Sequence, residues 1–537
     1  TAAEGPVTSF YQQFTGLDDP WPEVVYRSKR QATQGALASE VNALAHQLDR
    51  LARLDRRSRD FTLNGIRKAL REVVACFPVY RSYVSDAPSD TDKAVVGKAT
   101  RWAYRRNPLL GRAIFDFIRD TVLLKDPPSG PASDEYRALQ RRFAGKFQQV
   151  TSPVAAKGVE DTAFYVFNRF VSLNEVGGEP GRFGWKPDAA HAFLAARTAW
   201  AGSLNPLSTH DTKRSEDVRA RLNVLSEMPQ EWAACVGRWA ELNRPHKVEV
   251  EERLAPDANE EYLLYQALVG VWPVGEDRSA QWDTFRQRIR DYMKKALAEA
   301  KVNTSWINPN AEYEAAVAGF IDRVLDPAAS GPFLPFLTEL NAFAERVAGF
   351  GRVNSLAQTL IRCTAPGVPD TYQGSESWDF SLVDPDNRRP VDYTARANWL
   401  RELDTWPGKV PELARNLADP RAKLFVTAAA LRCRRDHPDL FASGGYTPVG
   451  ATGAQAGHAF AYLRTSGPRA ALVVVPRLPV GLEASGWGDT ALALPPEYTS
   501  ASGKNVLTGE TVAAPGGTLR VAEVLGAFPV ALLVTSG

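Results

Sequence analysis

The stretch Leu204-Asn205-Pro206-Leu207-Ser208-Thr209-His210-Asp211-Thr212-Lys213-Arg214 decides the fold prediction. Its first four residues form a short apolar run bounded by turns, which predicts a strand. A His-Asp pair directly after a strand is typical of the loops at the carboxyl ends of barrel strands, where catalytic groups lie. The neighbouring Lys213 and Arg214 favour an ionised Asp211, which suits a carboxylate that faces a developing cation. From this stretch alone, a solvated loop with an incidental ion pair is an equal alternative.

Length and composition exclude several classes of protein. The 537 residues exceed one ordinary core and predict two or three domains. Lys and Arg number 64 against 62 Asp and Glu, so the net charge of +2 gives no reason to expect nucleic acid or an anionic membrane as a partner. No run approaches the ~20 apolar residues that a membrane helix needs. Residues 1–10 lack both a signal-peptide core and an initiator Met, and we expect a processed chain or a fragment.

The cysteines indicate a reducing compartment. Cys76, Cys235, Cys363 and Cys433 lie far apart and have no CxxC spacing. This pattern favours neither a zinc site nor a disulfide framework, and a cytoplasmic location fits best. No cluster of metal ligands stands out in the sequence, so it indicates no metal site and no cofactor, and calcium binding stays an open alternative.

The hydrophobic pattern divides the chain into five segments. It predicts a mainly helical segment over residues 1–134, strands and polar loops over 135–214, a helical insertion over 215–347, a return to strands and helices over 348–439, and an antiparallel β-sandwich over 440–537. The last prediction rests on short apolar runs that alternate with Gly, Pro and Ser clusters.

Several elements are predicted individually. Residues 61–77 are expected to form a helix, with Asp60 or Thr62 near its N-cap. Further helices are expected at residues 231–242, 260–271, 282–300, 311–324, 353–363, 395–404 and 421–435. Strands are expected at residues 147–151, 204–207 and 367–374, and a strand or an extended edge at residues 76–81.

Two polar segments precede the His-Asp pair. Both combine charged residues with glycines, which suits the binding of hydroxyl groups, because charged groups bond hydroxyls more strongly than neutral groups do. Their candidate binding residues are Lys157, Glu160, Asp161, Tyr165 and Glu175. From these residues alone, a surface loop with a structural salt bridge is slightly favoured.

Taken together, five segments resemble the α-amylase superfamily and, within it, the maltooligosyltrehalose synthase family. The matching motifs lie at residues 59–62, 157–165, 174–178, 208–217 and 367–393. The resemblance implies an α/β fold: a (β/α)8 TIM barrel with large helical insertions and a C-terminal antiparallel β-sandwich.

The resemblance also implies a reaction. Enzymes of this kind convert the reducing-end α-1,4 bond of a maltooligosaccharide into an α,α-1,1 bond by a retaining double displacement. The released glucose must be turned in place with water excluded. Two alternatives remain: hydrolysis of the terminal trehalose bond, as in the related trehalohydrolases, and noncatalytic glucan binding.

The resemblance assigns roles to individual residues. Asp211 is implied to be the carboxylate that steadies the oxocarbenium-like transition state, and His210 to bond the same sugar ring. Lys213 and Arg214 are implied to set the charge of Asp211 or to reach the next sugar. Further implied substrate-binding residues are Lys157, Glu160, Asp161, Tyr165, Glu175, Tyr372 and Gln373.

One departure from the family pattern is large. The chain contains neither the superfamily motif with the nucleophilic Asp nor the one with the acid Glu, and the early barrel strands are absent as well. It therefore resembles the C-terminal part of such an enzyme, with only the second half of the barrel. A half barrel leaves open strand edges. We expect an N-terminal segment of the same enzyme to complete the fold, and no turnover from this chain alone.

Overall fold

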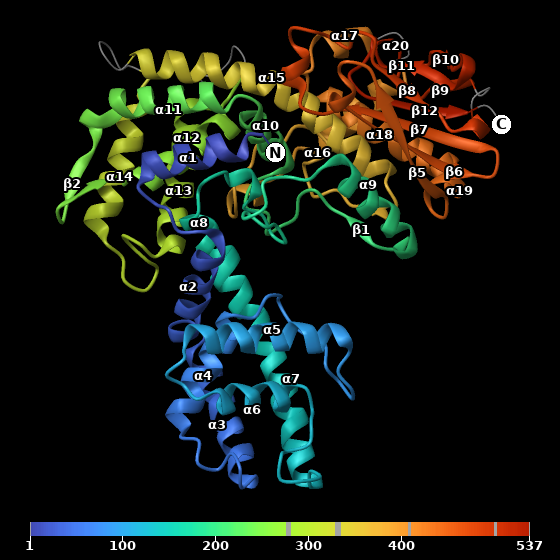
Figure 1. The fold of residues 1–537 in the computed structure, drawn as a ribbon. Helices are drawn as coiled ribbons and strands as arrows, with labels where there is room; N and C mark the ends of the chain where they lie inside the picture. Colours follow the sequence, from blue (N-terminus) through green and yellow to red (C-terminus); the bar gives the residue numbers. More distant parts are fainter. Residues whose placement is uncertain (1, 275–280, 328–333, 406–409, 499–501, 536–537) are drawn as a thin grey trace. The chain divides into compact units, whose positions relative to one another are not determined.

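The computed structural model describes residues 2–274, 281–327, 334–405, 410–498 and 502–535. The chain forms two compact units, both of them discontinuous in sequence. The main unit consists of Thr1–Leu17, Arg169–Lys295 and Ala311–Gly537, and the helical unit of Asp18–Asn168 and Ala296–Asn310. Figure 1 shows the course of the chain through both units.

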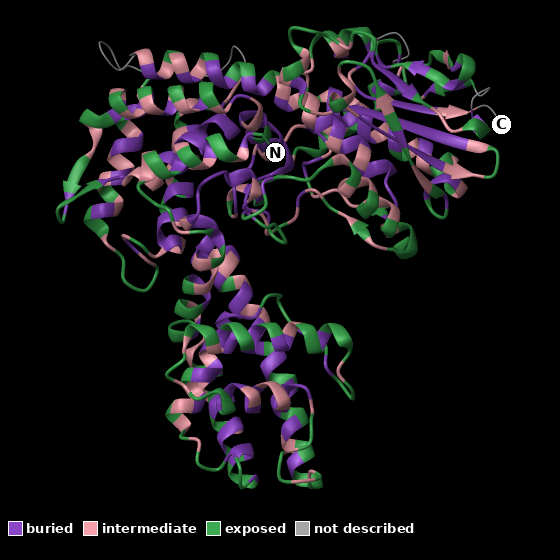
Figure 2. Cartoon of the chain, in the orientation of Figure 1, coloured by how far each residue is buried: buried purple, intermediate pink, exposed green. Residues whose placement is uncertain are grey.

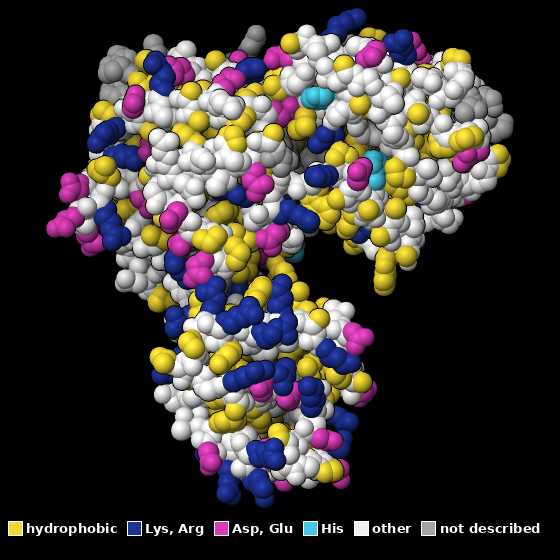
Figure 3. Space-filling model, in the orientation of Figure 1, with side chains coloured by type: hydrophobic (Ala, Val, Ile, Leu, Met, Phe, Trp, Pro, Cys, Tyr) yellow, Lys and Arg dark blue, Asp and Glu magenta, His cyan; other side chains and the backbone are white. Residues whose placement is uncertain are grey.

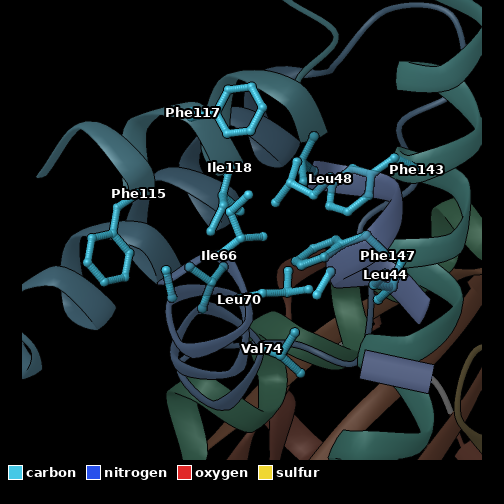
Figure 4. Close-up of a cluster of buried hydrophobic side chains, with 14 of the residues drawn as sticks. Leu44, Leu48, Ile66, Leu70, Val74, Phe115, Phe117, Ile118, Phe143 and Phe147 are labelled. Carbon is cyan, nitrogen blue, oxygen red and sulfur yellow. The ribbon is translucent and has the colours of Figure 1, made fainter. Parts of the chain in front are cut away.

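The helical unit has a core of its own. Its long helices are α2 (Trp21–Gln34), α3 (Ala38–Leu54), α4 (Leu63–Ala75), α5 (Asp90–Arg106), α6 (Arg112–Val122) and α7 (Asp134–Ala155). Figure 4 shows Leu44 and Leu48 of α3, Ile66 and Leu70 of α4, and Phe147 of α7 pointing toward one another. The opposite faces of these helices are solvated, and Figure 3 shows Lys and Arg side chains over this unit, where Lys98, Arg101 and Arg105 of α5 are exposed.

The predicted start of α4 is confirmed. Thr62 is the N-cap, and its side-chain oxygen accepts a hydrogen bond from the backbone N–H of Gly65 at 3.1 Å. Such a cap satisfies one of the N–H groups that have no partner inside the helix.

Replacing Thr62 by Ala is expected to lower the free energy of unfolding of the helical unit by about 1 kcal/mol, because the cap hydrogen bond is lost. Urea unfolding of the full chain, followed by amide hydrogen exchange in α4, measures the change. Thr62→Ser keeps the accepting oxygen and serves as the matched control. Equal losses in the two variants would contradict the assigned cap.

The strand predicted at residues 147–151 is wrong, and the strand or extended edge predicted at residues 76–81 does not form a strand. Residues 147–151 lie inside α7, where Phe143, Phe147 and Val150 recur at helical spacing on the buried face. Residues 76–81 follow the end of α4 without forming a strand. There the carbonyl oxygen of Phe77 accepts a hydrogen bond from the buried Lys29 Nζ at 2.6 Å in place of a strand partner.

Helix α7 continues directly into the polar segment that the sequence placed in a loop. Residues Ala156–Ala163 form the π-helix η1, and Phe164–Val166 form the short helix α8. A π-helix widens the turn and is frequent at functional sites. The polar side chains of this segment therefore project from a helix.

The main unit is helical over most of its first half. Its longer helices are α1 (Glu4–Thr15), α9 (Pro187–Ala196), α10 (Glu216–Val224), α11 (Pro229–Asn243), α12 (Ala258–Val271), α13 (Trp282–Ala300), α14 (Ala311–Val324), α15 (Leu334–Thr364), α16 (Tyr393–Leu403) and α18 (Arg421–Asp436). Those from α11 to α18 confirm the predicted helices. Helix α15 is longer than predicted, at 31 residues.

A hairpin within the predicted helical insertion was missed. Strands β2 (Val248–Val250) and β3 (Arg253–Ala255) pair antiparallel through a turn at Glu251 and Glu252, with φ of 49° and 64°. Two-residue turns with positive φ favour Asn and Gly. A Glu-Glu pair carries no such signal in the sequence.

Two predicted strands are confirmed in part and lie side by side. Strand β1 (Leu204–Asn205) pairs parallel with β4 (Val368–Pro369), and Leu204 lies opposite Val368. Gly367 has a φ of 114°, and a Cβ there would lie 2.7 Å from the Ser203 carbonyl oxygen, so this close approach requires glycine. Within the described ranges this is the one parallel strand pair.

The C-terminal region forms one antiparallel sheet of eight strands in the order β10-β9-β12-β7-β6-β5-β8-β11. Its strands are β5 (Gly445–Thr452), β6 (Ala459–Ser466), β7 (Arg469–Pro476), β8 (Ala491–Ala493), β9 (Ser502–Asn505), β10 (Thr511–Ala513), β11 (Thr518–Arg520) and β12 (Ala531–Thr535). Residues 445–449 of β5 pair with β6, and residues 450–452 pair with β8. The predicted sandwich is therefore a single sheet that bends at β5.

Both faces of the central strands β6 and β7 are buried, as the purple strands in Figure 2 show. Tyr462 and Val473 belong to a core shared with α15 and α18. Their neighbours Leu463 and Leu472 belong to a second core with Leu519 of β11. Side chains alternate between the two faces of a strand, so β6 and β7 each contribute to both cores.

No helix among the described residues has both the length and the apolar character required to cross a membrane.

Candidate functional site

The loop between β1 and α10 carries the His-Asp pair at the tip of a compact turn. The N–H of Thr209 donates to Thr212 Oγ1 at 2.5 Å, and the N–H of Asp211 donates to Thr209 Oγ1 at 3.3 Å. The Thr212 hydroxyl also donates to the Thr209 carbonyl oxygen at 3.0 Å. Such threonine turns fix the backbone locally. They leave His210 exposed and Asp211 half-buried at the surface of the main unit.

Lys213 forms an ion pair with Asp211 from the buried side of the loop. Lys213 Nζ lies 3.5 Å from Asp211 Oδ1, and the lysine side chain is only 3% exposed against 47% for the aspartate. An ion pair with one buried partner loses less attraction to solvent screening than an exposed pair. Lys213 therefore orients the carboxylate toward the loop and leaves part of it accessible to a ligand.

Glu175 binds the backbone of the same loop. Its carboxylate accepts hydrogen bonds from the N–H of Lys213 at 2.9 and 3.0 Å and from the N–H of Arg214 at 3.2 Å. It also pairs with Arg219 of α10 at 3.4 Å. Glu175, a predicted sugar ligand, thus positions the loop that carries Asp211.

Arg214 is directed into the interior. It is 1% exposed, and its guanidinium donates to the Val171 carbonyl at 3.3 Å, the Asn174 carbonyl at 3.5 Å and Tyr292 Oη at 2.8 Å. These bonds attach the loop to the segment that supplies Glu175. Contact of Arg214 with a sugar stays a prediction.

A third segment joins the loop through Asn387, which the sequence analysis did not single out. Asn387 Nδ2 donates to the His210 carbonyl oxygen at 3.1 Å, and the Asn387 carbonyl accepts from Tyr372 Oη at 3.2 Å. Tyr372 is half-buried and Gln373 is exposed just beyond β4. Asn387 therefore links His210 and Tyr372, through its side-chain amide to the former and its backbone carbonyl to the latter.

The remaining predicted residues belong to the helical unit. Lys157 Nζ pairs with Asp161 Oδ2 at 2.6 Å, one turn apart on η1, with exposures of 57% and 22%. Glu160 is buried and accepts a short hydrogen bond from Tyr80 Oη, and Tyr165 is also buried. Lys157 and Asp161 are thus the members of this group that are accessible to a ligand.

A separate cavity of about 740 Å³ lies within the main unit. Its walls are largely aromatic and include Phe170, Trp185 and Phe193. The carboxyl group of Glu227 is the acidic group in this lining and accepts a hydrogen bond from the N–H of Val480 at 2.9 Å. Burial raises the pKa of Glu227 to about 7.

This raised pKa predicts how stability depends on pH. Because the folded state holds the proton more tightly, the contribution of Glu227 is fully present below pH 4.5 and is lost as pH rises through about 7. Glu227→Gln should flatten that part of the pH dependence, which urea unfolding of both proteins between pH 4 and pH 8 measures. Identical slopes for the two proteins would contradict the assigned burial effect.

No group of three or more His, Cys, Asp or Glu side chains within the described ranges is arranged to hold a metal ion.

Comparison with known proteins gives matches among curated sequences and among solved structures. Two curated proteins from Mycobacterium tuberculosis, strains CDC 1551 / Oshkosh and H37Rv, are named "Putative maltooligosyl trehalose synthase" and are 43% identical over 392 residues. The match covers 73% of this chain but 45% of each relative, so the chain spans about half their length. No family model matches the sequence.

Solved structures agree with the sequence matches. The maltooligosyltrehalose synthase from Arthrobacter ramosus superposes with a TM-score of 0.81 at 34% identity, covering 100% of this chain and 61% of that one. A structure from Sulfolobus tokodaii, described as a "hypothetical maltooligosyl trehalose synthase", gives 0.70 at 26% identity over 99% of this chain and 60% of that one. This chain therefore resembles part of a maltooligosyltrehalose synthase.

Proposed function

We propose that this chain is the C-terminal part of an enzyme that converts the reducing-end α-1,4 bond of a maltooligosaccharide into an α,α-1,1 bond, an intramolecular transglucosylation that forms maltooligosyltrehalose. The observation that carries the proposal is the resemblance of the entire chain to the Arthrobacter ramosus enzyme. The His210-Asp211 loop supports it, because separate segments of the main unit converge to present one accessible carboxylate.

The proposed chemistry has two displacement steps. In the first, a carboxylate nucleophile forms a bond to the anomeric carbon, the α-1,4 C–O bond breaks, and the acid group protonates the departing oxygen of glucose. In the second, the anomeric hydroxyl of the turned glucose attacks the same carbon, the enzyme ester breaks, and the acid group, now a base, takes up the hydroxyl proton. Asp211 stabilises the positive charge that develops on the sugar ring in both steps, and His210 forms a hydrogen bond with that ring.

The released glucose must be held while it turns. Lys157 and Asp161 are suited to bind its hydroxyls as charged partners. The buried Glu160 and Tyr165 contribute to this pocket from behind, by supporting the helix that carries Lys157 and Asp161. Tyr372 and Gln373 bind the glucan from the loop after β4. Asp211 is held in place for the sugar by Lys213, Glu175 and Arg214, which fix the loop that carries it.

The nucleophile and the acid would come from an N-terminal segment of the same enzyme. In this proposal β1 and β4 belong to the second half of a (β/α)8 barrel, and that segment supplies the earlier strands. Leu204 is 61% exposed and Val368 is 41% exposed, although both lie in strands, as expected for sheet residues that another part of the barrel would cover. The four free thiols favour a cytoplasmic location.

Incubation with maltopentaose tests the proposal. The chain combined with the N-terminal segment should remove reducing ends without releasing much free trehalose, and the chain alone should give no turnover. Release of trehalose would favour the trehalohydrolase-like hydrolase. Glucan binding without turnover, even with the N-terminal segment present, would favour a noncatalytic binding role. Turnover by residues 1–537 alone would contradict the assignment of the missing carboxylates.

A further inference from the structure

Three charged side chains meet in the interior directly behind the His210-Asp211 loop. Lys423 of α18 lies 2.8 Å from Glu216 Oε1 and 2.9 and 3.0 Å from the two oxygens of Asp217. Side-chain exposure is 0% for Lys423, 2% for Glu216 and 1% for Asp217. The two acids open α10, the helix that follows the loop.

Glu216 closes the loop at its base. The Ser208 hydroxyl donates to Glu216 Oε2 at 3.1 Å, and the Glu216 N–H donates back to Ser208 Oγ at 3.0 Å. These two bonds bring together the residues on either side of the turn that carries Asp211. The position of Glu216 therefore sets the width of the loop.

Asp217 attaches the closed loop to two other segments. It accepts hydrogen bonds from Ser355 Oγ of α15 at 2.6 Å and from the N–H of Asp379 at 2.8 Å. The N–H of Ser215 in turn donates to the Ser381 carbonyl at 3.0 Å. Lys423 contacts both acids, and it joins this arrangement to α18.

Stability alone is a weak reason for such a cluster. A buried ion pair pays a desolvation penalty that often equals its attraction, and apolar replacements of similar volume are frequently neutral. Burial raises the pKa of Asp217, and the Lys423 charge opposes that rise. Two buried carboxylates that share one ammonium are better explained by a requirement for fixed geometry.

We infer that Lys423, with Glu216 and Asp217, is a positioning group that fixes the His210-Asp211 loop for the transition state. The expected effect on kinetics rests on the proposed function, whereas the fixed position of the loop rests on the contacts of Lys423, Glu216 and Asp217.

Replacement of Lys423 by Met, which keeps most of the side-chain volume, tests the kinetic part. With the N-terminal segment present, kcat should fall about 100-fold, because a displacement of a catalytic group by about 1 Å costs that much. KM for maltopentaose should change less than about threefold, since the loss concerns the transition state. Lys294→Met removes an exposed lysine of α13 and should leave both constants unchanged.

A double variant separates positioning from general stability. Lys423→Met leaves the buried charge of Asp217 without its partner, and adding Asp217→Asn removes that charge. The thermal midpoint of the double variant should therefore recover toward that of the wild type, while its kcat stays low. Recovery of kcat together with the midpoint would overturn the inference. Wild-type kcat in folded Lys423→Met would overturn it as well.

Hydrogen exchange in the chain itself gives a readout that needs no activity. The amides of Lys213 and Arg214 should exchange at least about tenfold faster in Lys423→Met, which corresponds to a change of ~1.4 kcal/mol in the opening free energy. Amides of β6 and β7 should keep their rates. Unchanged exchange at Lys213 and Arg214 would overturn the inference, whereas absence of maltooligosyltrehalose from the wild-type reaction would overturn only the proposed function.

Discussion

Replacing Asp211 by Asn is expected to lower kcat for maltopentaose conversion about 100- to 1,000-fold, the cost typical of removing one group that stabilises transition-state charge. The amide keeps the shape of the side chain but removes the negative charge that faces the developing oxocarbenium ion. KM should change little, because that charge develops only in the transition state. Steady-state kinetics of the chain with its N-terminal segment measure the effect.

The control for this variant is an aspartate of the same unit with no proposed role. Asp283 on α13 has a side chain that is 91% exposed, and Asp283→Asn should leave kcat unchanged. Asp211→Asn should also keep the thermal midpoint of the wild type within about 2 °C, because a half-exposed surface residue contributes little to stability. Wild-type kcat in Asp211→Asn would remove Asp211 from the catalytic site.

Replacing Phe147 by Ala is expected to destabilise the helical unit by about 3–5 kcal/mol, the range for deleting a buried aromatic side chain. Phe147 is 0% exposed, and its ring centroid lies 5.5 Å from that of Phe77 and 6.1 Å from that of Phe143. Removal of the Phe147 ring abolishes both ring contacts and leaves a cavity. Amide exchange of α7 as a function of urea concentration measures the loss for this unit within the full chain.

Gln149 is the matched control, because it lies two residues away on the exposed face of the same helix. Gln149→Ala should change the free energy of unfolding by less than about 0.5 kcal/mol. If residues 147–151 formed an isolated surface strand, Phe147→Ala and Gln149→Ala would have similar small effects.

The sequence predicted the long helices of the main unit well, because their apolar residues recur at helical spacing over many turns. Residues 147–151 were too few to distinguish a helix from a strand, and the correct assignment required the extension of α7 back to Asp134. Hairpin β2–β3 was missed because Glu251 and Glu252 adopt positive φ without the usual turn residues.

The candidate site was predictable where its members are neighbours in sequence. The contact between Lys213 and Asp211 follows from a spacing of two residues. Asn387 reaches the His210 carbonyl across 177 residues, and Lys423 reaches Asp217 across 206. Side chains so distant in sequence meet only through tertiary packing, and nothing in the local pattern marks them.

The discontinuity of the main unit bears on how the chain folds during synthesis. Helix α1 is synthesised long before its packing partners, because the Tyr11 hydroxyl donates a hydrogen bond to Asn259, 248 residues later, and Phe10 and Phe14 pack on Tyr262. At roughly 5–20 residues per second, translation of that interval takes roughly 12–50 s. Residues Asp18–Asn168, which hold the core of the helical unit, are complete well before then. Helix α1 is thus buried only after residues 259–262 have been synthesised, and its aromatic face is open to chaperones in the meantime.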